Sequence, residues 1–315
     1  MRNPAGLFIK KVIAVYQYPK NIQTIAQLLQ KWSNAGMQID TADNASDVLN
    51  RIGYYRLKGY AFHLIDQTTG QFQQGTTFAN VVSLYQFDTK LSHLVFSFLS
   101  SIEVTLRARL VSALLTNNDA LILNDPSFFK DKETYWKNQS SIASEIARSN
   151  DVFIKHNYDN HDGAIPLWAT VEVMSFGTLS KVIKNLKPGN VTYTALIDSY
   201  KVMSANGNLV VPSQKMFTSW IQAVAVMRNI CAHNSRIYNR VISTIPELTL
   251  ADRVNPPVQY NGLYQILLAM KYLRPTDDDW NTFVTELKYL FAQYASVVDT
   301  SKLNFPTDWN NHFQL

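Results

Sequence analysis

The sequence predicts an all-α protein. Apolar residues recur at helical spacing through most of the 315-residue chain, whereas convincing strand patterns are scarce. Hydrophobic residues make up 46% of the chain and charged residues 17%, which indicates a packed globular protein and excludes the disordered class. We therefore expect an antiparallel helical bundle over residues 77–315, preceded by a helical extension over residues 1–76.

The extension contains two predicted helices. The first covers residues 21–35, where apolar side chains recur every three or four positions and Gly36 is a stop signal. The second begins near Asp43 and leads into an aromatic and basic segment at residues 53–60. Residues 66–76 are rich in Gln, Thr and Gly, which favours a turn or a short hairpin.

The remaining chain alternates long helices with polar connectors. Helices are predicted over residues 77–116, 127–152, 167–186, 213–240, 260–273 and 277–297. The first of these is either one long helix or two joined by a bend, and Gly177 is a weak point in the third. Residues 157–166 are expected to be a loop, and prolines make residues 246–257 irregular. Thr276 and the aspartates after it suit the start of the last helix.

Charge and cysteine usage limit the class of protein. The net charge of +5 and the pI of about 9.1 are compatible with a polyanionic partner such as RNA. The single cysteine, Cys231, excludes an internal disulfide and a multi-cysteine zinc site. Lys10 and Lys11 interrupt the short apolar stretch at residues 5–9, so we expect no signal peptide, no membrane span and a cytoplasmic location.

The helix predicted over residues 213–240 has an unusual polar face. On an ideal helix, one arc contains three arginines, two asparagines and a histidine, with no acidic residue. These residues are Arg228, Asn229, His233, Arg236, Asn239 and Arg240. The opposite side is mainly apolar and includes Cys231, which we expect to be packed and inert. A solvated helix face normally mixes both charge signs, so this arc indicates a binding or catalytic surface.

Such a face suits a phosphodiester. The planar guanidinium of Arg228 matches two phosphate oxygens, and His233 can exchange a proton near neutral pH. RNA supplies its own nucleophile, the 2′-hydroxyl, so neither a metal nor a cofactor is needed. One histidine does not easily act as both acid and base, which favours a symmetric dimer, although a monomer could recruit another residue or water. A lone histidine that is merely hydrogen-bonded is the alternative interpretation.

Other candidate residues lie outside this helix. Glu103 and Arg107 share a helix face, and Glu103 either orients Arg228 or His233 or makes a structural ion pair. A second set could stack bases and hold phosphates, unless its tyrosines only pack the edge of the bundle. This set comprises Tyr54, Tyr55, Arg56, Lys58 and Tyr60. Arg236, Asn239 and Arg240 are candidates for phosphates beyond the scissile one.

Two clusters invite a metal site but have simpler explanations. His156 and His161, with nearby aspartates, match no ligand spacing and indicate a loop. Residues 277–279, three consecutive aspartates, suit the first turn of a helix. The sequence therefore predicts no metal site.

Five blocks of sequence follow one another in an order that resembles a known family. They are residues 53–60 (GYYRLKGY), residues 85–88 (YQFD) with 102–107 (IEVTLR), residues 166–168 (PLW) with 175–180 (SFGTLS), residues 227–240 (MRNICAHNSRIYNR) and residues 305–309 (FPTDW). Together they resemble the Abi-like (AbiD/AbiF) abortive-infection proteins of bacteria. Each block alone is weak, whereas five in order are specific.

The resemblance implies a HEPN domain, a usually dimeric helical bundle with an R-x4-H ribonuclease motif between protomers. The matching residues are Arg228, Asn229 and His233. Related HEPN domains cut RNA in toxins and in RNA-targeting CRISPR effectors. The resemblance also implies phage defence by growth arrest and, in some members, a small structured non-coding RNA as partner. A non-catalytic RNA-binding module and a toxin component regulated by an RNA or protein partner remain alternatives.

Overall fold

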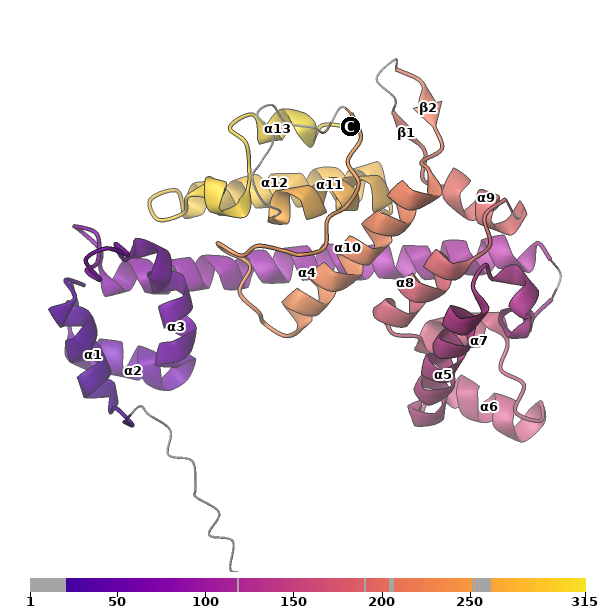
Figure 1. Ribbon diagram of the computed structural model, residues 1–315, viewed down its shortest axis with the longest axis horizontal. Helices are drawn as coiled ribbons and strands as arrows, with labels where there is room; N and C mark the ends of the chain where they lie inside the picture. Colours follow the sequence, from indigo (N-terminus) through magenta and orange to yellow (C-terminus); the bar gives the residue numbers. More distant parts are fainter. Residues whose placement is uncertain (1–20, 118, 190, 204–206, 251, 253–261) are drawn as a thin grey trace, which may run out of the picture. The chain divides into compact units, whose positions relative to one another are not determined.

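The computed structural model describes residues 21–117, 119–189, 191–203, 207–250, 252 and 262–315 (Figure 1). This part of the chain is mostly helical, with one antiparallel pair of two-residue strands, β1 (Val202–Met203) and β2 (Leu209–Val210). The predicted all-α class is therefore confirmed. None of the described helices has the length and apolarity needed to cross a bilayer. The expectations for residues 5–11 and for Pro256 and Pro257 fall outside the described residues.

The chain forms two compact units. The first comprises Met1–Lys58 and Leu64–Phe78, described from residue 21 onward, and the second comprises Gly59–His63 and Ala79–Leu315. The second unit contains every residue of the predicted catalytic helix and its supporting pair. The aromatic and basic residues at positions 54–58 belong to the first unit.

The first unit is built around a tryptophan. Its helices are α1 (Ile25–Asn34), α2 (Ala42–Ile52) and the beginning of α3 (Tyr54–Ala61). The Trp32 ring is buried and lies 4.6 Å from the Tyr54 ring and 6.5 Å from the Phe72 ring, measured between centroids. An isolated antiparallel bridge joins Ile65 to Phe72. The two helices and the turn predicted for this region are thus confirmed.

The second unit holds the remaining elements. In chain order they are η1 (Phe62–Leu64, shared with the first unit), α4 (Phe78–Leu115), η2 (Ile122–Asn124), η3 (Pro126–Phe128), α5 (Lys132–Arg148), α6 (Val152–Asn160), α7 (Leu167–Val173), α8 (Phe176–Asn185), α9 (Val191–Asp198), β1, β2, α10 (Gln214–Ala232), α11 (Leu263–Leu273), α12 (Asp277–Gln293), η4 (Thr300–Leu303) and α13 (Trp309–His312). The open question about residues 77–116 is resolved, because α4 is one helix of 38 residues.

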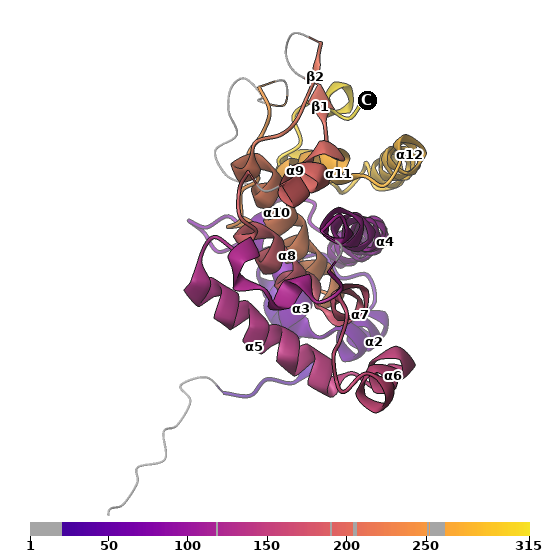
Figure 2. The ribbon, with the colours of Figure 1, turned by 90° about the vertical axis from the view of Figure 1, so that its right-hand side faces the viewer.

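The core of the second unit forms where long helices pack side by side. Along α4 and α12, the Phe98 ring lies 4.9 Å from the Phe283 ring, and Figure 2 shows both helices nearly end on. Helix α10 packs against α11 on one side and α8 on another. Trp220 of α10 is completely buried, and its ring stacks on Tyr272 of α11 with centroids 4.8 Å apart. This packing fixes the position of α10 relative to its neighbours.

Two boundaries predicted between residues 157 and 186 are wrong. The helix expected over residues 167–186 is broken into α7 and α8 at Met174 and Ser175, and not at Gly177. Both break residues have extended backbones, and the Ser175 hydroxyl caps α8 by accepting the N–H of Thr178 at 3.2 Å. The loop expected over residues 157–166 is shorter than predicted, since α6 continues to Asn160.

Candidate functional site

The site is organised around Arg107 of α4. Its guanidinium donates hydrogen bonds to three backbone carbonyls at the end of α7, those of Val171, Glu172 (3.2 Å) and Met174 (2.6 Å). The last carbonyls of a helix have no partner within the helix and bear a partial negative charge, so a buried arginine suits this position. Arg107 Nη2 also lies 2.5 Å from Oε1 of Glu103, one turn earlier on α4.

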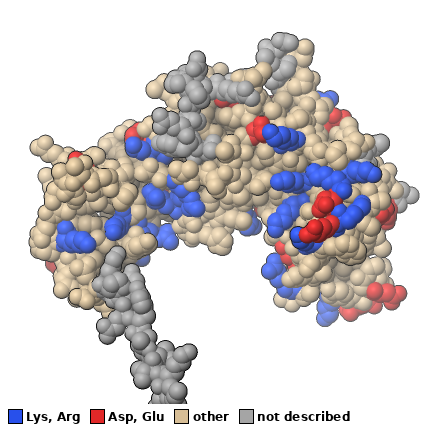
Figure 3. Space-filling view, viewed as in Figure 1, with Lys and Arg blue, Asp and Glu red and all other residues tan. Residues whose placement is uncertain are grey.

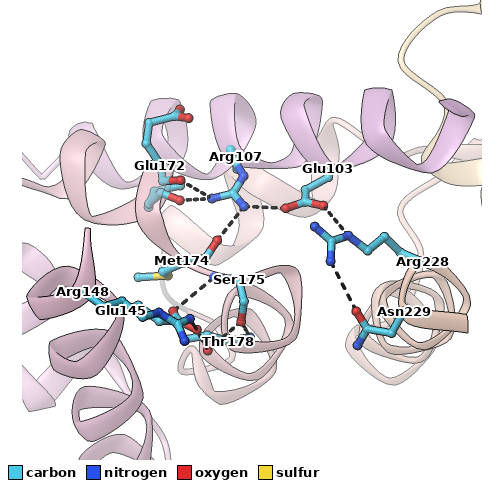
Figure 4. Close-up of polar contacts among 11 residues, drawn as sticks. Glu103, Arg107, Glu145, Arg148, Glu172, Met174, Ser175, Thr178, Arg228 and Asn229 are labelled. Atoms are coloured by element: carbon cyan, nitrogen blue, oxygen red, sulfur yellow. Dashed lines mark hydrogen bonds and ion pairs between the residues drawn. The ribbon is translucent and has the colours of Figure 1, made fainter. Parts of the chain in front are cut away.

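The second oxygen of Glu103 faces α10. Glu103 Oε2 lies 3.4 Å from Nε of Arg228, which is an ion pair and not a hydrogen bond (Figure 4). The side chains of Glu103 and Arg107 are only 11% and 10% exposed, whereas that of Arg228 is 33% exposed. Two guanidinium groups share one carboxylate, so the three side chains together carry a net charge of +1 (two positive charges and one negative).

The exposed part of this cluster lies on α10. Arg228 Nη1 lies 3.4 Å from Oδ1 of Asn229, whose residue is exposed, and the Arg228 guanidinium lies over the Phe96 ring at 6.0 Å. These contacts hold the buried Nε edge of the guanidinium and leave part of the side chain accessible. A partly exposed arginine with an unbalanced positive charge can bind an anion such as a phosphate.

Helix α10 ends at Ala232, so His233 is its C-terminal cap. The N–H of Asn234 donates to the carbonyl of Cys231 (2.9 Å), and the N–H of Ser235 donates to that of Ile230 (2.9 Å). This pair of bonds is a Schellman motif, and Asn234 occupies its left-handed position with φ of 48°. Asparagine tolerates this conformation better than most residues. The motif leaves His233 exposed at the helix end.

The inner side of the same turn is packed. Cys231 is 4% exposed, and burial raises the pKa of its thiol to about 11. A thiol with so high a pKa is almost entirely protonated near neutral pH and is a poor nucleophile. The structure thus supports the expectation that Cys231 is packed and inert.

The chain after His233 is held by Asp88 of α4, a residue that the sequence did not single out as functional. Its carboxylate accepts the N–H groups of Ile237 (3.0 Å) and Tyr238 (2.7 Å) and the hydroxyl of Tyr60 (2.6 Å). Asp88 is 2% exposed, and burial raises the pKa of its carboxyl above the ordinary value while these hydrogen bonds lower it. Asp88 is the last residue of the YQFD block at residues 85–88, so its place in this block was the sequence feature that could have pointed to it.

The prediction that Arg236, Asn239 and Arg240 share a helix face with Arg228 is wrong, because α10 ends before them. Arg236 instead donates to the carbonyl of Gly59 at 2.9 Å, and Arg240 donates to the carbonyl of Arg236 at 3.3 Å. Asn239 has a left-handed backbone, with φ of 53°. All three are partly exposed, and RNA binding by them remains a prediction.

The aromatic and basic cluster of the first unit has a mixed character. Tyr54 packs against Trp32, and burial raises the pKa of its hydroxyl. Tyr55 is 88% exposed, and Arg56 and Lys58 are also exposed. The packing interpretation therefore fits Tyr54 and also Tyr60 of the second unit, which is 2% exposed and donates to Asp88. Tyr55, Arg56 and Lys58 have the exposure that an RNA contact requires.

The suspected metal clusters have structural explanations. His156 lies on α6 and His161 caps its end, with ring centroids 5.2 Å apart. The three aspartates occupy the first turn of α12, which the Thr276 side chain caps as predicted. Among the described residues, no group of three histidine, cysteine or acidic side chains could hold a metal ion.

A protein-family model matches most of the chain that contains this site. The family model described as Abi-like protein matches residues 47–239, which is more than half of the chain. No curated protein and no solved structure shows a significant match. The matched range contains Asp88, Glu103, Arg107, Arg228 and His233, whereas Arg240 lies one residue beyond it.

Proposed function

The chain belongs to the Abi-like protein family, and from this premise we propose that it is a metal-independent HEPN-type endoribonuclease acting in abortive infection against phage. Arg228, Asn229 and His233 are the proposed catalytic residues. Glu103 and Arg107 are proposed positioning residues. Glu103 contacts Arg228, Arg107 contacts Glu103, and both side chains are mostly buried.

One observation supports this proposal above all. A buried carboxylate, itself fixed by Arg107, holds the guanidinium of Arg228 five residues before an exposed histidine. Preorganised positive charge lowers the energy of a transition state in which negative charge builds up on a phosphate, because the enzyme need not reorganise during the reaction. An ordinary surface arginine would lack this fixed orientation.

The proposed reaction uses the RNA's own nucleophile. An imidazole removes the 2′-hydroxyl proton, O2′ forms a bond to phosphorus, and the bond from phosphorus to O5′ breaks. A protonated group supplies the proton that the leaving O5′ takes up. Arg228 stabilises the additional negative charge on the phosphoryl oxygens. The products are a 2′,3′-cyclic phosphate and a 5′-hydroxyl.

We propose that two copies of the chain form the complete site. Arg228 of α10 and His233, the residue that caps it, are separated on an ideal helix by about 7.5 Å along the axis and by about 140° around it. A single copy therefore presents the guanidinium and the imidazole in different directions. A symmetric pair would supply one histidine as base and its twin as acid.

The test compares the wild type with His233→Ala and Arg228→Ala on mixed cellular RNA in the presence of EDTA. We expect cleavage only by the wild type, with 5′-hydroxyl and cyclic-phosphate ends, while circular dichroism shows all three folded. RNA binding without any cleavage would favour the non-catalytic alternative. Cleavage that requires a divalent metal would contradict the proposal.

A further inference from the structure

Helices α8 and α10 themselves have no acidic residue, although acids of other segments lie beside them. The sequences of α8 and α10 contain four lysines and arginines and no aspartate or glutamate. One of the four, Lys215, is paired with Glu247 at 2.5 Å. Figure 3 shows lysine and arginine side chains gathered over α5 and α8, with a few acidic side chains among them. Acids of α5 have basic partners, since Glu133 pairs with Lys137 and Glu145 lies near Arg148.

The exposed residues of the two helices form parallel rows. Along α10 and its cap residue, the positions i, i+4, i+7 and i+11 are occupied by Gln222, Val226, Asn229 and His233, and all but Val226 are exposed. On α8, Gly177, Lys181 and Lys184 recur at i, i+4 and i+7, and both lysines are exposed. Residues at these spacings lie within about 60° of one another on a helix.

Contacts at both ends show how the rows align. Lys184 Nζ donates to Oε1 of Gln222 at 3.1 Å, near the end of α8 and in the first half of α10. Just before α8 begins, the Met174 carbonyl binds Arg107, which is linked through Glu103 to Arg228 near the end of α10. The two helices therefore run antiparallel, and the lysines flank the row that leads to His233.

We propose that Lys181 and Lys184, beside Gln222, bind the backbone of the RNA strand on one side of the cut phosphate. This inference rests on the proposed function in taking single-stranded RNA as the ligand. Gln222 and Asn229 are separated by about 10.5 Å along α10, so the lysines meet the strand beyond the scissile phosphate. Two exposed lysines in a row beside the proposed catalytic helix suit an extended polyanion, such as a nucleic-acid strand, better than a small ligand with a single negative charge.

The test measures binding of a fluorescent single-stranded RNA to Lys181→Gln/Lys184→Gln in a His233→Ala background, which prevents cleavage during titration. The matched control is Lys155→Gln/Lys288→Gln, which removes the same charge from exposed lysines of α6 and α12. Figure 2 shows these helices away from α8. Circular dichroism and thermal melts establish that both double variants fold.

We expect several-fold weaker binding at low salt for the α8 variant and little change for the control. The slope of log affinity against log salt should become shallower by about 1.4, or about 0.7 for each lost contact with a single strand. In the His233 wild-type background, KM should rise while kcat stays unchanged, because the lost contact is not specific to the transition state.

An α8 variant that matches the control in affinity and salt slope would overturn the inference, whether or not the wild type cuts RNA. If the wild type binds RNA without cutting it and the α8 variant still loses binding, the nuclease proposal fails and the binding surface stands. Loss of binding to poly-glutamate with unchanged RNA binding would also overturn the inference, and would indicate an acidic protein partner.

Discussion

Glu103 Oε2 on α4 lies 3.4 Å from Arg228 Nε on α10. This contact joins the supporting pair to the proposed catalytic helix, although the two residues are far apart in the sequence. It makes Glu103 a shared partner, because its other oxygen pairs with Arg107. The orientation of Arg228 therefore depends on a residue that need not touch RNA.

Glu103→Gln should lower both stability and cleavage. It leaves two guanidinium groups near a neutral amide, and removing one partner of a mostly buried ion pair costs about 3 kcal/mol of unfolding free energy. Urea unfolding measures the loss, and kcat for RNA cleavage should fall because Arg228 is less well oriented. Glu133→Gln, which removes the acid of the exposed Glu133–Lys137 pair, is the matched control and should change neither quantity. Equal effects of the two substitutions would contradict a special role for Glu103.

Asp88→Asn should destabilise the protein. In the wild type, the carboxylate accepts two backbone N–H groups, whereas the NH2 group of the new amide can only donate and would face one of these N–H groups. The loss should be roughly 2 kcal/mol near neutral pH, the size expected for an unsatisfied buried polar group. RNA cleavage should also fall, because the chain after His233 loses its anchor. Unchanged stability would show that the carboxylate is not an anchor.

The same variant tests the raised pKa of Asp88. The ordinary pKa of an aspartate is about 4, and at a pH below this value the Asp88 carboxyl is mostly protonated in both the folded and the unfolded states. As the pH rises, the unfolded chain loses the proton first, so the stability contributed by Asp88 falls until the folded state also ionises. The stability advantage of the wild type over Asp88→Asn should therefore be larger near pH 4 than near pH 7. Urea unfolding of both proteins at each pH measures it, and a larger advantage at pH 7 would show that the hydrogen bonds outweigh burial.

Asn234 offers a test of the turn that exposes His233. Asn234→Gly should leave stability unchanged or slightly higher, because glycine adopts a positive φ without strain. Asn234→Val should cost about 1–2 kcal/mol, the penalty for a left-handed backbone at a residue with a bulky Cβ. Thermal unfolding separates the two variants, and cleavage should fall only in the valine variant. Similar behaviour of the two would mean that the Schellman turn does not position His233.

Much of the fold was predictable because helical periodicity is a local signal. The helices beginning near residues 25, 42, 214 and 277 follow from apolar spacing, and Thr24 and Thr276 cap their helices as threonine commonly does. The errors lie where a short polar signal overrides periodicity. Ser175 interrupts a continuous apolar pattern with a new cap, and the left-handed Asn234 ends α10 three residues after its last buried apolar residue, Cys231.

The candidate site was only partly predictable. Spacing along a helix predicts that Glu103 lies near Arg107 and that Arg228 lies near His233, but it does not predict contacts between residues of different helices. The contact between Glu103 and Arg228 depends on how α4 packs beside α10, which apolar spacing does not specify. The role of Asp88 was missed for the same reason, since its partners at positions 60, 237 and 238 come together only in the folded chain.

The most direct test of the central claim replaces the nucleophile. A short RNA with a mapped cleavage site is compared with the same RNA carrying a single 2′-deoxynucleotide immediately 5′ of the cut phosphate, both with EDTA present. Transesterification assisted by Arg228 and His233 predicts rapid cleavage of the first RNA and none of the second at that bond. Cleavage of both RNAs at the same bond and rate would show that water is the nucleophile and would contradict the proposed mechanism.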